Sequence, residues 1–295
     1  MRLLRRLAHR PTIIAGIVIV LAFTLVAIFA PLLEPYPTDR PSGEPFEPPS
    51  SAHWLGTDDV GVDMLSLTIA GTQNSMLVGF AAAFVAILVG GTVGIIAGYR
   101  GGWSETGVVG VTDFFLVIPG LPLMIVLAAI FGQSIYHIVV VIGLLSWMSV
   151  SYVVRAQVHT LKVRGFVARS RSLGASDSYI IRRHILPHVA PLLVAQTVLA
   201  VAIAVFFEAA LAFVGLGDLE RISWGTILQQ AFQHTAVSAG AWWAIVPPGV
   251  CIALVVLGCF LVGQGVEEAM NPRLGHAHVA PRSFARRSTW VEEER

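Results

Sequence analysis

Residues 166–188 read FVARSRSLGASDSYIIRRHILPH and form the one long polar segment between two long apolar runs of the chain. The segment carries four arginines against one acid, a balance typical of loops on the cytoplasmic side of a membrane. Gly174 follows Leu173 where glycine readily ends a helix in the left-handed conformation, and Ser176 is placed to cap a second helix that begins near Asp177. The segment therefore predicts a short helical hairpin at the cytoplasmic face, a shape suited to contact with a soluble partner.

The composition of the 295-residue chain indicates an integral membrane protein. Hydrophobic residues make up 55% of it and charged residues 13%, half of the roughly 25% charged share of soluble domains. Cys251 and Cys259, the only cysteines, fall in one apolar run and offer neither a disulfide framework nor a metal site, so we expect them to pack. Membrane lipid is the expected surrounding, and neither a nucleic-acid partner nor a metal is expected.

Six apolar runs are long enough to cross a bilayer, which takes about 20 residues. The first follows an arginine-rich start and is too long for the core of a signal peptide, so it predicts an uncleaved helix whose N-terminus is inside. Six crossings bring the C-terminus inside as well. Of the 19 lysines and arginines, only Arg40 and Arg221 then lie outside, in agreement with the positive-inside rule. The runs are 11–33, 75–98, 112–132, 135–155, 191–215 and 242–264.

The predicted fold is all-α, and the chain divides where these runs begin and end. The expected segments are a cytoplasmic N-terminus (1–10), a first transmembrane helix (11–34), an external loop with a short amphipathic helix (35–73), a five-helix core (74–270) that contains a cytoplasmic loop (156–190), and a cytoplasmic tail (271–295).

The two longest predicted outer loops carry the remaining polar sequence. The first is proline-rich and acidic, and its end, residues 59–71, predicts a short amphipathic helix on the outer membrane surface. The second, residues 215–240, contains Trp224, which suits either a partner or the headgroup zone, where aromatic side chains are common. The expected apolar face of the short helix comprises Val60, Met64, Leu65, Thr68 and Ile69.

Two acids fall within predicted spans, where an ionised side chain costs about 2.5 kcal/mol or more. Asp113 is near the cytoplasmic start of its span and can remain hydrated there. Glu208 is near the outer end of the fifth span and suits either the translocation route or a hydrogen bond between helices, of which the second is the more common. Prolines are expected to bend two spans, Pro119 and Pro122 the third, and Pro247 and Pro248 the sixth.

The sequence carries no recognisable catalytic or nucleotide-binding motif. Lys162, the only lysine, is preceded by Leu161 rather than by the glycine of a phosphate-binding loop. His184 and His188 have the spacing of a metal pair, but Pro187 intervenes and no carboxylate or thiol is close in sequence, so no metal site is predicted. These observations argue against an enzyme. ATP-driven transport would need a partner chain that binds ATP and Mg²⁺.

The central segment resembles the EAA loop of permease subunits from binding-protein-dependent ATP-binding cassette importers. In that family Glu-Ala-Ala, three residues, Gly and then Leu-Pro recur at fixed separation, and Gly174, Leu186 and Pro187 match this pattern. The position of the loop agrees with the family pattern, although its first three residues differ from the family's Glu-Ala-Ala. In place of Glu-Ala-Ala the chain has Ala168, Arg169 and Ser170.

Further segments are similar to the second permease of the oligopeptide, dipeptide and nickel branch of this family. Residues 53–63, HWLGTDDVGVD, look like its HxxGTDxxGRD signature, with Val62 in place of arginine. FVGLG at 213–217 and SWG at 223–225 resemble its FLGLG and SWG segments. The resemblance covers nearly the whole chain up to residue 274. The last matches are Trp242-Trp243 with Pro247, and Asn271-Pro272-Arg273-Leu274.

The resemblance implies the type I ABC importer permease fold, with six transmembrane helices and cytoplasmic termini. Its implied partners are a second homologous permease, two ATPase subunits or a fused equivalent, and an external solute-binding protein. The central loop would be a coupling helix in a groove of the ATPase, formed by Ala168, Arg169, Ser170, Gly174, Ala175, Ser176 and Asp177, with Leu186 and Pro187 fixing its exit. As a hypothesis, the external protein is received at Asp58, Asp59, Asp63 and Trp224.

Peptides are the expected substrate class for this branch, with nickel or another small solute as the alternative. The implied location is the inner membrane of a bacterium. An ion-coupled secondary transporter would instead show inverted repeats and paired intramembrane charges. A scaffold that transports nothing is a further alternative. Neither of these two accounts for the central loop.

Overall fold

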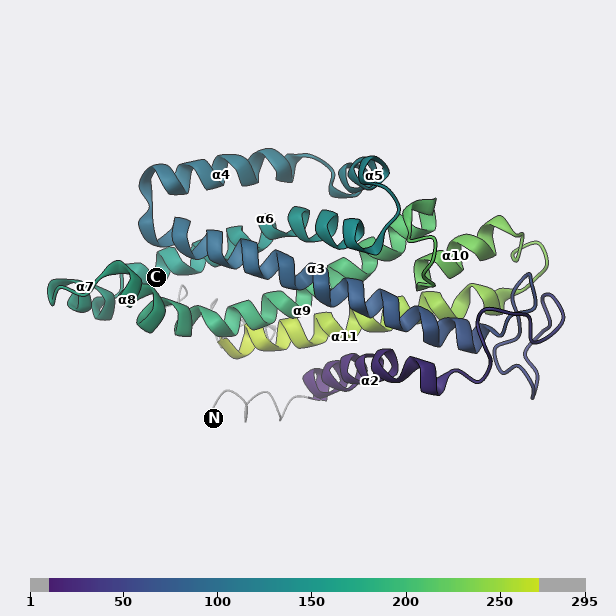
Figure 1. Cartoon of the computed structure of the whole chain (residues 1–295). Helices are drawn as coiled ribbons and strands as arrows, with labels where there is room; N and C mark the ends of the chain where they lie inside the picture. The colour runs from purple at the N-terminus through teal and green to yellow at the C-terminus, as the bar shows by residue number, and fades with distance from the viewer. Residues whose placement is uncertain (1–10, 271–295) are drawn as a thin grey trace, which may run out of the picture.

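The computed structural model describes residues 11–270, with side chains up to residue 266, and all regular structure in that range is helical. Five helical segments are long and apolar enough to cross a membrane, and α4 (Gly102–Val117) with α5 (Gly120–Phe131) makes a sixth if that bent pair is one span. The predicted all-helical fold is confirmed (Figure 1). The segments 1–10 and 271–295 lie outside the described residues. The long helices are α2 (Pro11–Leu33), α3 (Met64–Arg100), α6 (Ile135–Lys162), α9 (Leu186–Leu211) and α11 (Val246–Met270).

The longest helix, α3, replaces the predicted short surface helix and the span behind it. Asp63 caps α3 by accepting a hydrogen bond from the backbone N–H of Ser66, and nothing in the following 37 residues breaks the helix. Met64 and Thr68, expected on a membrane-facing surface, are buried. The prediction of a separate amphipathic helix is therefore wrong. At 1.5 Å per residue α3 is about 55 Å long, well beyond a hydrocarbon core of about 30 Å.

α3 packs most extensively against α6, and glycines on α3 make this approach possible. Gly90, Gly94 and Gly98 recur every fourth residue, so they lie on one face of the helix. A Cβ at Gly94 would lie 2.8 Å from the carbonyl oxygen of Ser151, and one at Gly98 would lie 2.8 Å from that of Arg155. Small residues at such spacing let two helix backbones meet closely inside a membrane.

The third predicted span is broken rather than bent. α4 ends at Val117, Ile118 is extended (φ −78°, ψ 129°), and α5 begins at Gly120 with its axis turned by 91°. The ring of Pro119 disfavours a helical conformation at the residue before it, which explains why the helix stops there. Pro122 lies in the first turn of α5. The break is sharper than the predicted kink, and α4 begins earlier, at Gly102, than the predicted span.

The prolines of the last span do not bend it. α11 begins at Val246, so Pro247 and Pro248 occupy its first turn, where backbone N–H groups have no partner within the helix. They follow a 3₁₀ turn, η3 (Trp242–Ala244). The prediction of a kink inside this span is wrong because the apolar run starts before the helix does.

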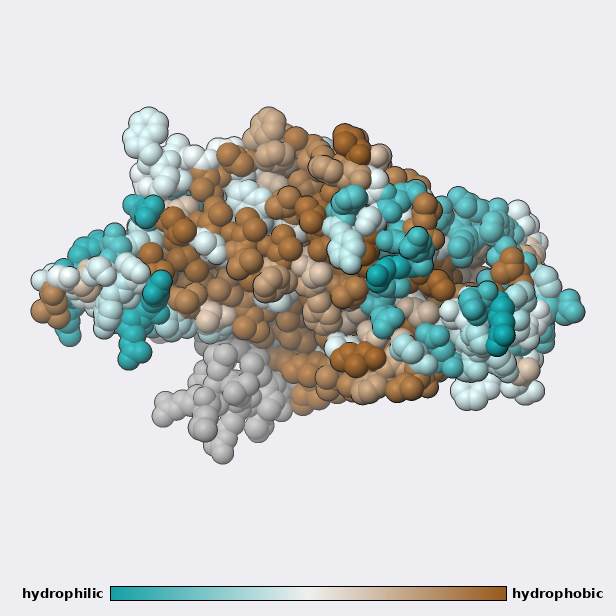
Figure 2. Space-filling view, in the orientation of Figure 1, coloured by the Kyte–Doolittle hydropathy of each residue, from teal (hydrophilic) through white to brown (hydrophobic). Residues whose placement is uncertain are grey.

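The surface has an apolar middle and two polar ends (Figure 2). α7 and α8 lie at one end, whereas α10 and the loop before α3 lie at the other (Figure 1). Large side chains such as Phe84 and Ile130 point outward in the apolar middle, as expected of a surface that meets lipid or another membrane subunit. The polar ends are the two places where soluble proteins can dock.

Candidate functional site

The predicted helical hairpin is present. α7 (Gly165–Ser172) ends in a turn at Gly174, whose φ of +81° is the left-handed conformation that glycine adopts without strain. Ser176 caps α8 (Asp177–Ile180) by accepting from the N–H of Tyr179. No atom lies within 4 Å of a Cβ built on Gly174, so the tip of the hairpin is open to a partner.

The second arm of the hairpin continues directly into the membrane. α8 is followed by one π-helical turn, η1 (Ile181–Ile185), and then by α9. Pro187 has no N–H to donate to the preceding turn, and its ring would crowd the carbonyl of residue 183 in a regular helix, whereas the wider π turn relieves this crowding. Leu186 and Pro187 therefore lie in the first turn of α9, where the family pattern predicts the exit of the loop.

An apolar plug fastens the hairpin to the bundle. Val167 of α7, Ile180 of α8 and Ile185 of η1 are fully buried in one cluster with Val154 and Val158 of α6. Side chains become more exposed toward the tip of the hairpin, where Leu173 is 82% exposed. The hairpin thus has a fixed base and a free end.

The predicted coupling residues lie on different sides of this hairpin. Ser170 is half-buried, and its hydroxyl lies 3.0 Å from Nε2 of His184. Asp177 reaches back to the end of α3, where its Oδ1 accepts from the hydroxyl of Tyr99 at 2.7 Å. The exposed members are Ala168, Arg169, Gly174, Ser176, Asp177, Leu186 and Pro187, and Ala175 is half-buried.

The two histidines of the hairpin are engaged in packing. Nδ1 of His188 lies 2.6 Å from the carbonyl oxygen of His184, and the ring of Phe166 stacks on His188 at 5.2 Å between centroids. Within residues 11–270, no group of three or more histidine, cysteine or acidic residues is placed to hold a metal ion.

At the outer end, residues 53–63 form the core of an ordered cap. Nδ1 of His53 lies 2.9 Å from Oδ1 of Asp63, while Oδ2 of Asp63 accepts from the N–H and the hydroxyl of Ser66. The indole N–H of Trp243 donates to the carbonyl of Thr57 at 3.0 Å. Asp63 is 1% exposed, so its predicted contact with an external protein is wrong: its carboxylate joins the cap to α3.

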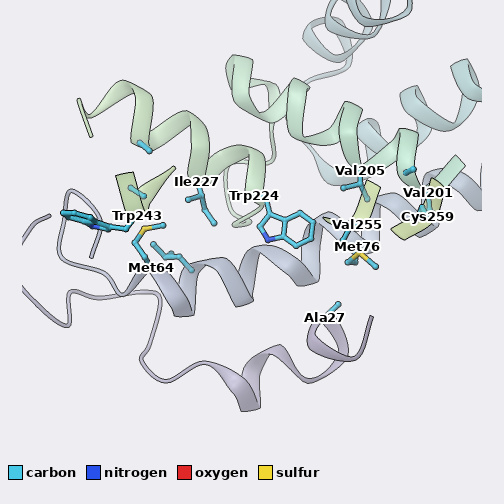
Figure 3. Packing of buried hydrophobic residues seen from close by; sticks show 14 of the residues in the cluster. Ala27, Met64, Met76, Val201, Val205, Trp224, Ile227, Trp243, Val255 and Cys259 are labelled. Carbon is cyan, nitrogen blue, oxygen red and sulfur yellow. The ribbon is translucent and has the colours of Figure 1, made fainter. Parts of the chain in front are cut away.

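Trp224 is also inside the protein rather than on its outer surface. It begins α10 (Trp224–Gln233), a short amphipathic helix that folds back on the bundle, and its side chain is 0% exposed (Figure 3). The indole N–H donates to the carbonyl of Thr68, and the ring meets Phe23 edge to face. The prediction that Trp224 contacts a binding protein is therefore wrong.

Asp58 and Asp59 remain at the outer surface. Burial raises the pKa of the Asp58 carboxyl, while hydrogen bonds from the N–H groups of Val62 and Val60 lower it. Oδ2 of Asp59 lies 2.6 Å from Nδ1 of His234 at the end of α10. Asp58 thus holds the loop within the cap and Asp59 ties the cap to α10, and both stay partly exposed.

Glu208 connects three helices below the cap. It is 3% exposed, and its Oε2 accepts from the hydroxyl of Ser75 at 3.0 Å, with a further hydrogen bond to the side chain of Ser223. The hydroxyl oxygen of Ser75 accepts in turn from the N–H of Trp224. This network matches the structural reading of Glu208, whereas Asp113 is exposed on α4 and has no comparable setting among the described residues.

We expect Glu208→Leu to lower the free energy of unfolding by about 1–3 kcal/mol, because the hydroxyls aimed at the carboxylate lose their acceptor. Glu208→Gln keeps an oxygen at the same place and should retain most of the stability. Thermal unfolding of the purified variants in detergent measures both. If Glu208→Gln is as stable as the wild type yet fails in uptake, the carboxylate belongs to the translocation route instead.

A cavity of about 260 Å³ opens beside the break between α4 and α5. Its wall is mostly apolar, with Ser146, Ser149 and Gln196 as the polar side chains. No sequence pattern predicts this cavity, because its lining residues come from four separate helices. Nearby, Phe114 and Val117 on α4 are largely exposed. The other lining residues include Phe115, Leu123, Met124, Met148, Leu199 and Phe207.

The fold is a bundle of membrane-crossing helices with a cavity on one side and a helical hairpin at one end, an arrangement suited to a transmembrane permease subunit. The chain belongs to the family of binding-protein-dependent transport system inner membrane components, whose profile matches residues 90–276. Residues 2–49 match the N-terminal transmembrane domain of oligopeptide transport permease C. The family resemblance noted in the sequence is thereby confirmed, as is a multi-pass membrane location, and the hairpin lies within the first of these two matches.

Several curated permeases are similar over most of the chain. Identity is 34% with the dipeptide transport system permease protein DppC of Alkalihalophilus pseudofirmus, across 92% of this chain and 88% of that protein. It is 32% with the oligopeptide transport system permease protein OppC of Bacillus subtilis, across 88% and 85%. It is 31% with the glutathione transport system permease protein GsiD of Pectobacterium atrosepticum, across 92% and 90%. These relatives are named as permeases rather than as enzymes.

Proposed function

We propose that this chain is the second permease subunit of an ATP-driven importer of oligopeptides or dipeptides in a bacterial inner membrane. The substrate class is that named for two of the relatives above. The observation that carries the proposal is the hairpin, whose base is fixed in the bundle while its tip is free for a cytoplasmic partner. In this proposal both chain termini face the cytoplasm.

The partners are those of a binding-protein-dependent importer. A second, homologous permease covers the exposed face of α4 and α5, so that the cavity beside α5 becomes part of a shared translocation path. Ser146 and Ser149 offer hydrogen bonds to a peptide backbone there, in a mostly apolar wall. Two ATP-binding cassette subunits, or a fused equivalent, hold ATP and Mg²⁺ and hydrolyse the nucleotide.

The tip of the hairpin enters the ATPase. Leu173 supplies an exposed apolar anchor, and Arg169 supplies positive charge beside it. The family glutamate is replaced by Ala168, so the ATPase of this importer meets a cationic rather than an acidic start of the hairpin. Closure of the ATPase pair then pulls on the hairpin and moves the helices between inward-open and outward-open arrangements.

Purification of the subunit with its partners tests this function. We expect an ATPase and a second permease to copurify, and hydrolysis in liposomes to rise when an external solute-binding protein and a peptide are added. If nickel rather than a peptide stimulates ATP hydrolysis, nickel is the substrate. A chain that purifies alone and moves solute along an ion gradient would refute the importer.

Asp58 and Asp59 are the remaining candidates for contact with the external binding protein. In a chain whose Cys251 and Cys259 are replaced by alanine, we expect Asp59→Cys to crosslink to the binding protein from outside. Leu173→Cys, which is more exposed and lies at the opposite end, is the control and should crosslink only to the ATPase. Crosslinks from neither end to these partners would contradict the proposed orientation of the chain.

A further inference from the structure

The hydroxyl of Tyr99 joins the hairpin to the cytoplasmic end of α3. It donates to Oδ1 of Asp177 at 2.7 Å, and Nη2 of Arg171 donates to the same hydroxyl at 3.2 Å. The guanidinium of Arg171 also lies over the Tyr99 ring, 5.7 Å from its centroid. One side chain of α3 therefore holds both arms of the hairpin, α7 through Arg171 and α8 through Asp177.

This contact adds something that the apolar plug lacks. Contacts such as those of Val167 and Ile180 are non-directional, so they resist separation of the hairpin from the bundle more than they resist rotation or sliding. Hydrogen bonds require alignment, and bonds that involve a charged group are roughly twice as strong as neutral ones. Tyr99 is 4% exposed, so its ring is held firmly in the bundle, while its hydroxyl meets the exposed side chains of Asp177 and Arg171 at the edge of the protein.

Tyr99 is also placed to receive movement. It lies one residue before the end of α3, and the neighbouring Gly98 packs against Val158 and the backbone of Arg155 on α6. A displacement of Asp177 would act on the last turn of α3 and, through that packing, on α6. The next residues, Gly101 and Gly102, have positive φ and begin another helix, so α3 ends firmly at this point.

We propose that Tyr99 is a positioning residue for coupling: it fixes the hairpin to α3 so that a pull by the ATPase moves the membrane helices. Asp177 then acts toward the bundle rather than toward the ATPase. The inference rests on the proposed function above. A simpler explanation is that Asp177 only stabilises the positive N-terminal end of α8. The two explanations predict different effects of removing the Tyr99 hydroxyl. Its removal leaves the charge of Asp177 at α8 in place, so only the first explanation predicts a loss of coupling.

The test uses the complete importer in liposomes and measures peptide transported per ATP hydrolysed. We expect Tyr99→Phe to copurify with normal amounts of ATPase and to keep its melting temperature within a few degrees, but to lower this ratio about tenfold. Tyr152→Phe is the matched control: Tyr152 also lies beneath an arginine, Arg155, and its hydroxyl has no hydrogen bond within residues 11–270. It should transport as the wild type does.

Variants of the acceptor sharpen the result. Asp177→Asn keeps an oxygen for the Tyr99 hydroxyl and should retain most of the coupling, whereas Asp177→Ala should lose it. The double variant Tyr99→Phe with Asp177→Ala should transport as much peptide per ATP as Asp177→Ala alone, because the two substitutions remove the same hydrogen bond. Normal transport per ATP in Tyr99→Phe would overturn the inference, as would a parallel loss of assembly. A wild-type complex without peptide-stimulated hydrolysis would refute the proposed function itself.

Discussion

Gly94→Leu is expected to abolish the folded permease. A Cβ at this position would lie 2.8 Å from the carbonyl oxygen of Ser151 and 3.0 Å from Cβ of Val154, so α3 and α6 must move apart. Overpacking of a well-packed site costs about 1–3 kcal/mol even for small additions. A whole leucine between two backbones should exceed that range, because the helices that separate form the most extensive pair in the bundle.

The measurement for Gly94→Leu is the yield of monodisperse protein after detergent extraction. Gly249→Leu is the matched control, since a Cβ at Gly249 of α11 meets nothing within 4 Å. The control should give nearly the wild-type yield. A normal yield of Gly94→Leu would mean that the close approach of α3 and α6 is not needed for the fold.

Gly174→Asp should leave the membrane part folded and uncouple it from ATP hydrolysis. An aspartate at φ +81° costs about 1–2 kcal/mol of backbone strain and places a negative charge at the tip, between Arg171 and Asp177. Because the tip is exposed and its base is buried, the damage should stay at the contact with the ATPase. We expect uptake to fall more than tenfold while insertion is unchanged.

Gly174→Asn separates the two causes of this loss. Asparagine has nearly the same shape and tolerates the left-handed conformation, but it brings no charge. Uptake and copurification of the ATPase are compared for both variants. Partial uptake in Gly174→Asn points to repulsion by the charge, whereas equal loss in both points to the shape of the turn. Normal uptake in Gly174→Asp would refute the role of this hairpin in coupling.

The membrane helices could be predicted because a run of about 20 apolar residues is typical of a helix that crosses a bilayer. The runs do not show where a helix begins, however. Pro247 and Pro248 look like interruptions in the sequence, yet they open α11. Likewise, Pro119 changes a kink into a break because the residue before it becomes extended, a local preference that hydropathy does not contain.

The outer end shows what a single sequence can hide. Trp224 was expected at the surface, although Ser223 and Thr226 form a capping box and Trp224, Ile227 and Ala231 share one helical face. That pattern would have predicted an amphipathic helix with the tryptophan inside. By contrast, nothing local predicts that His53 meets Asp63 inside the cap, since the pair depends on how the loop folds over α3. The helical hairpin could be predicted because the residues that form its turn and its cap, Gly174 and Ser176, are close together in the sequence.

The uninterrupted length of α3 has a mechanical consequence. Its first turn is held in the outer cap through Asp63, and its last turn holds the hairpin through Tyr99. A stiff lever about 55 Å long that tilts by about 10° around its middle shifts each tip by about 5 Å in opposite directions. Binding of the external solute-binding protein and closure of the ATPase would then act on the two ends of one rigid helix. The two events would be synchronised directly, without a series of intermediate conformational changes.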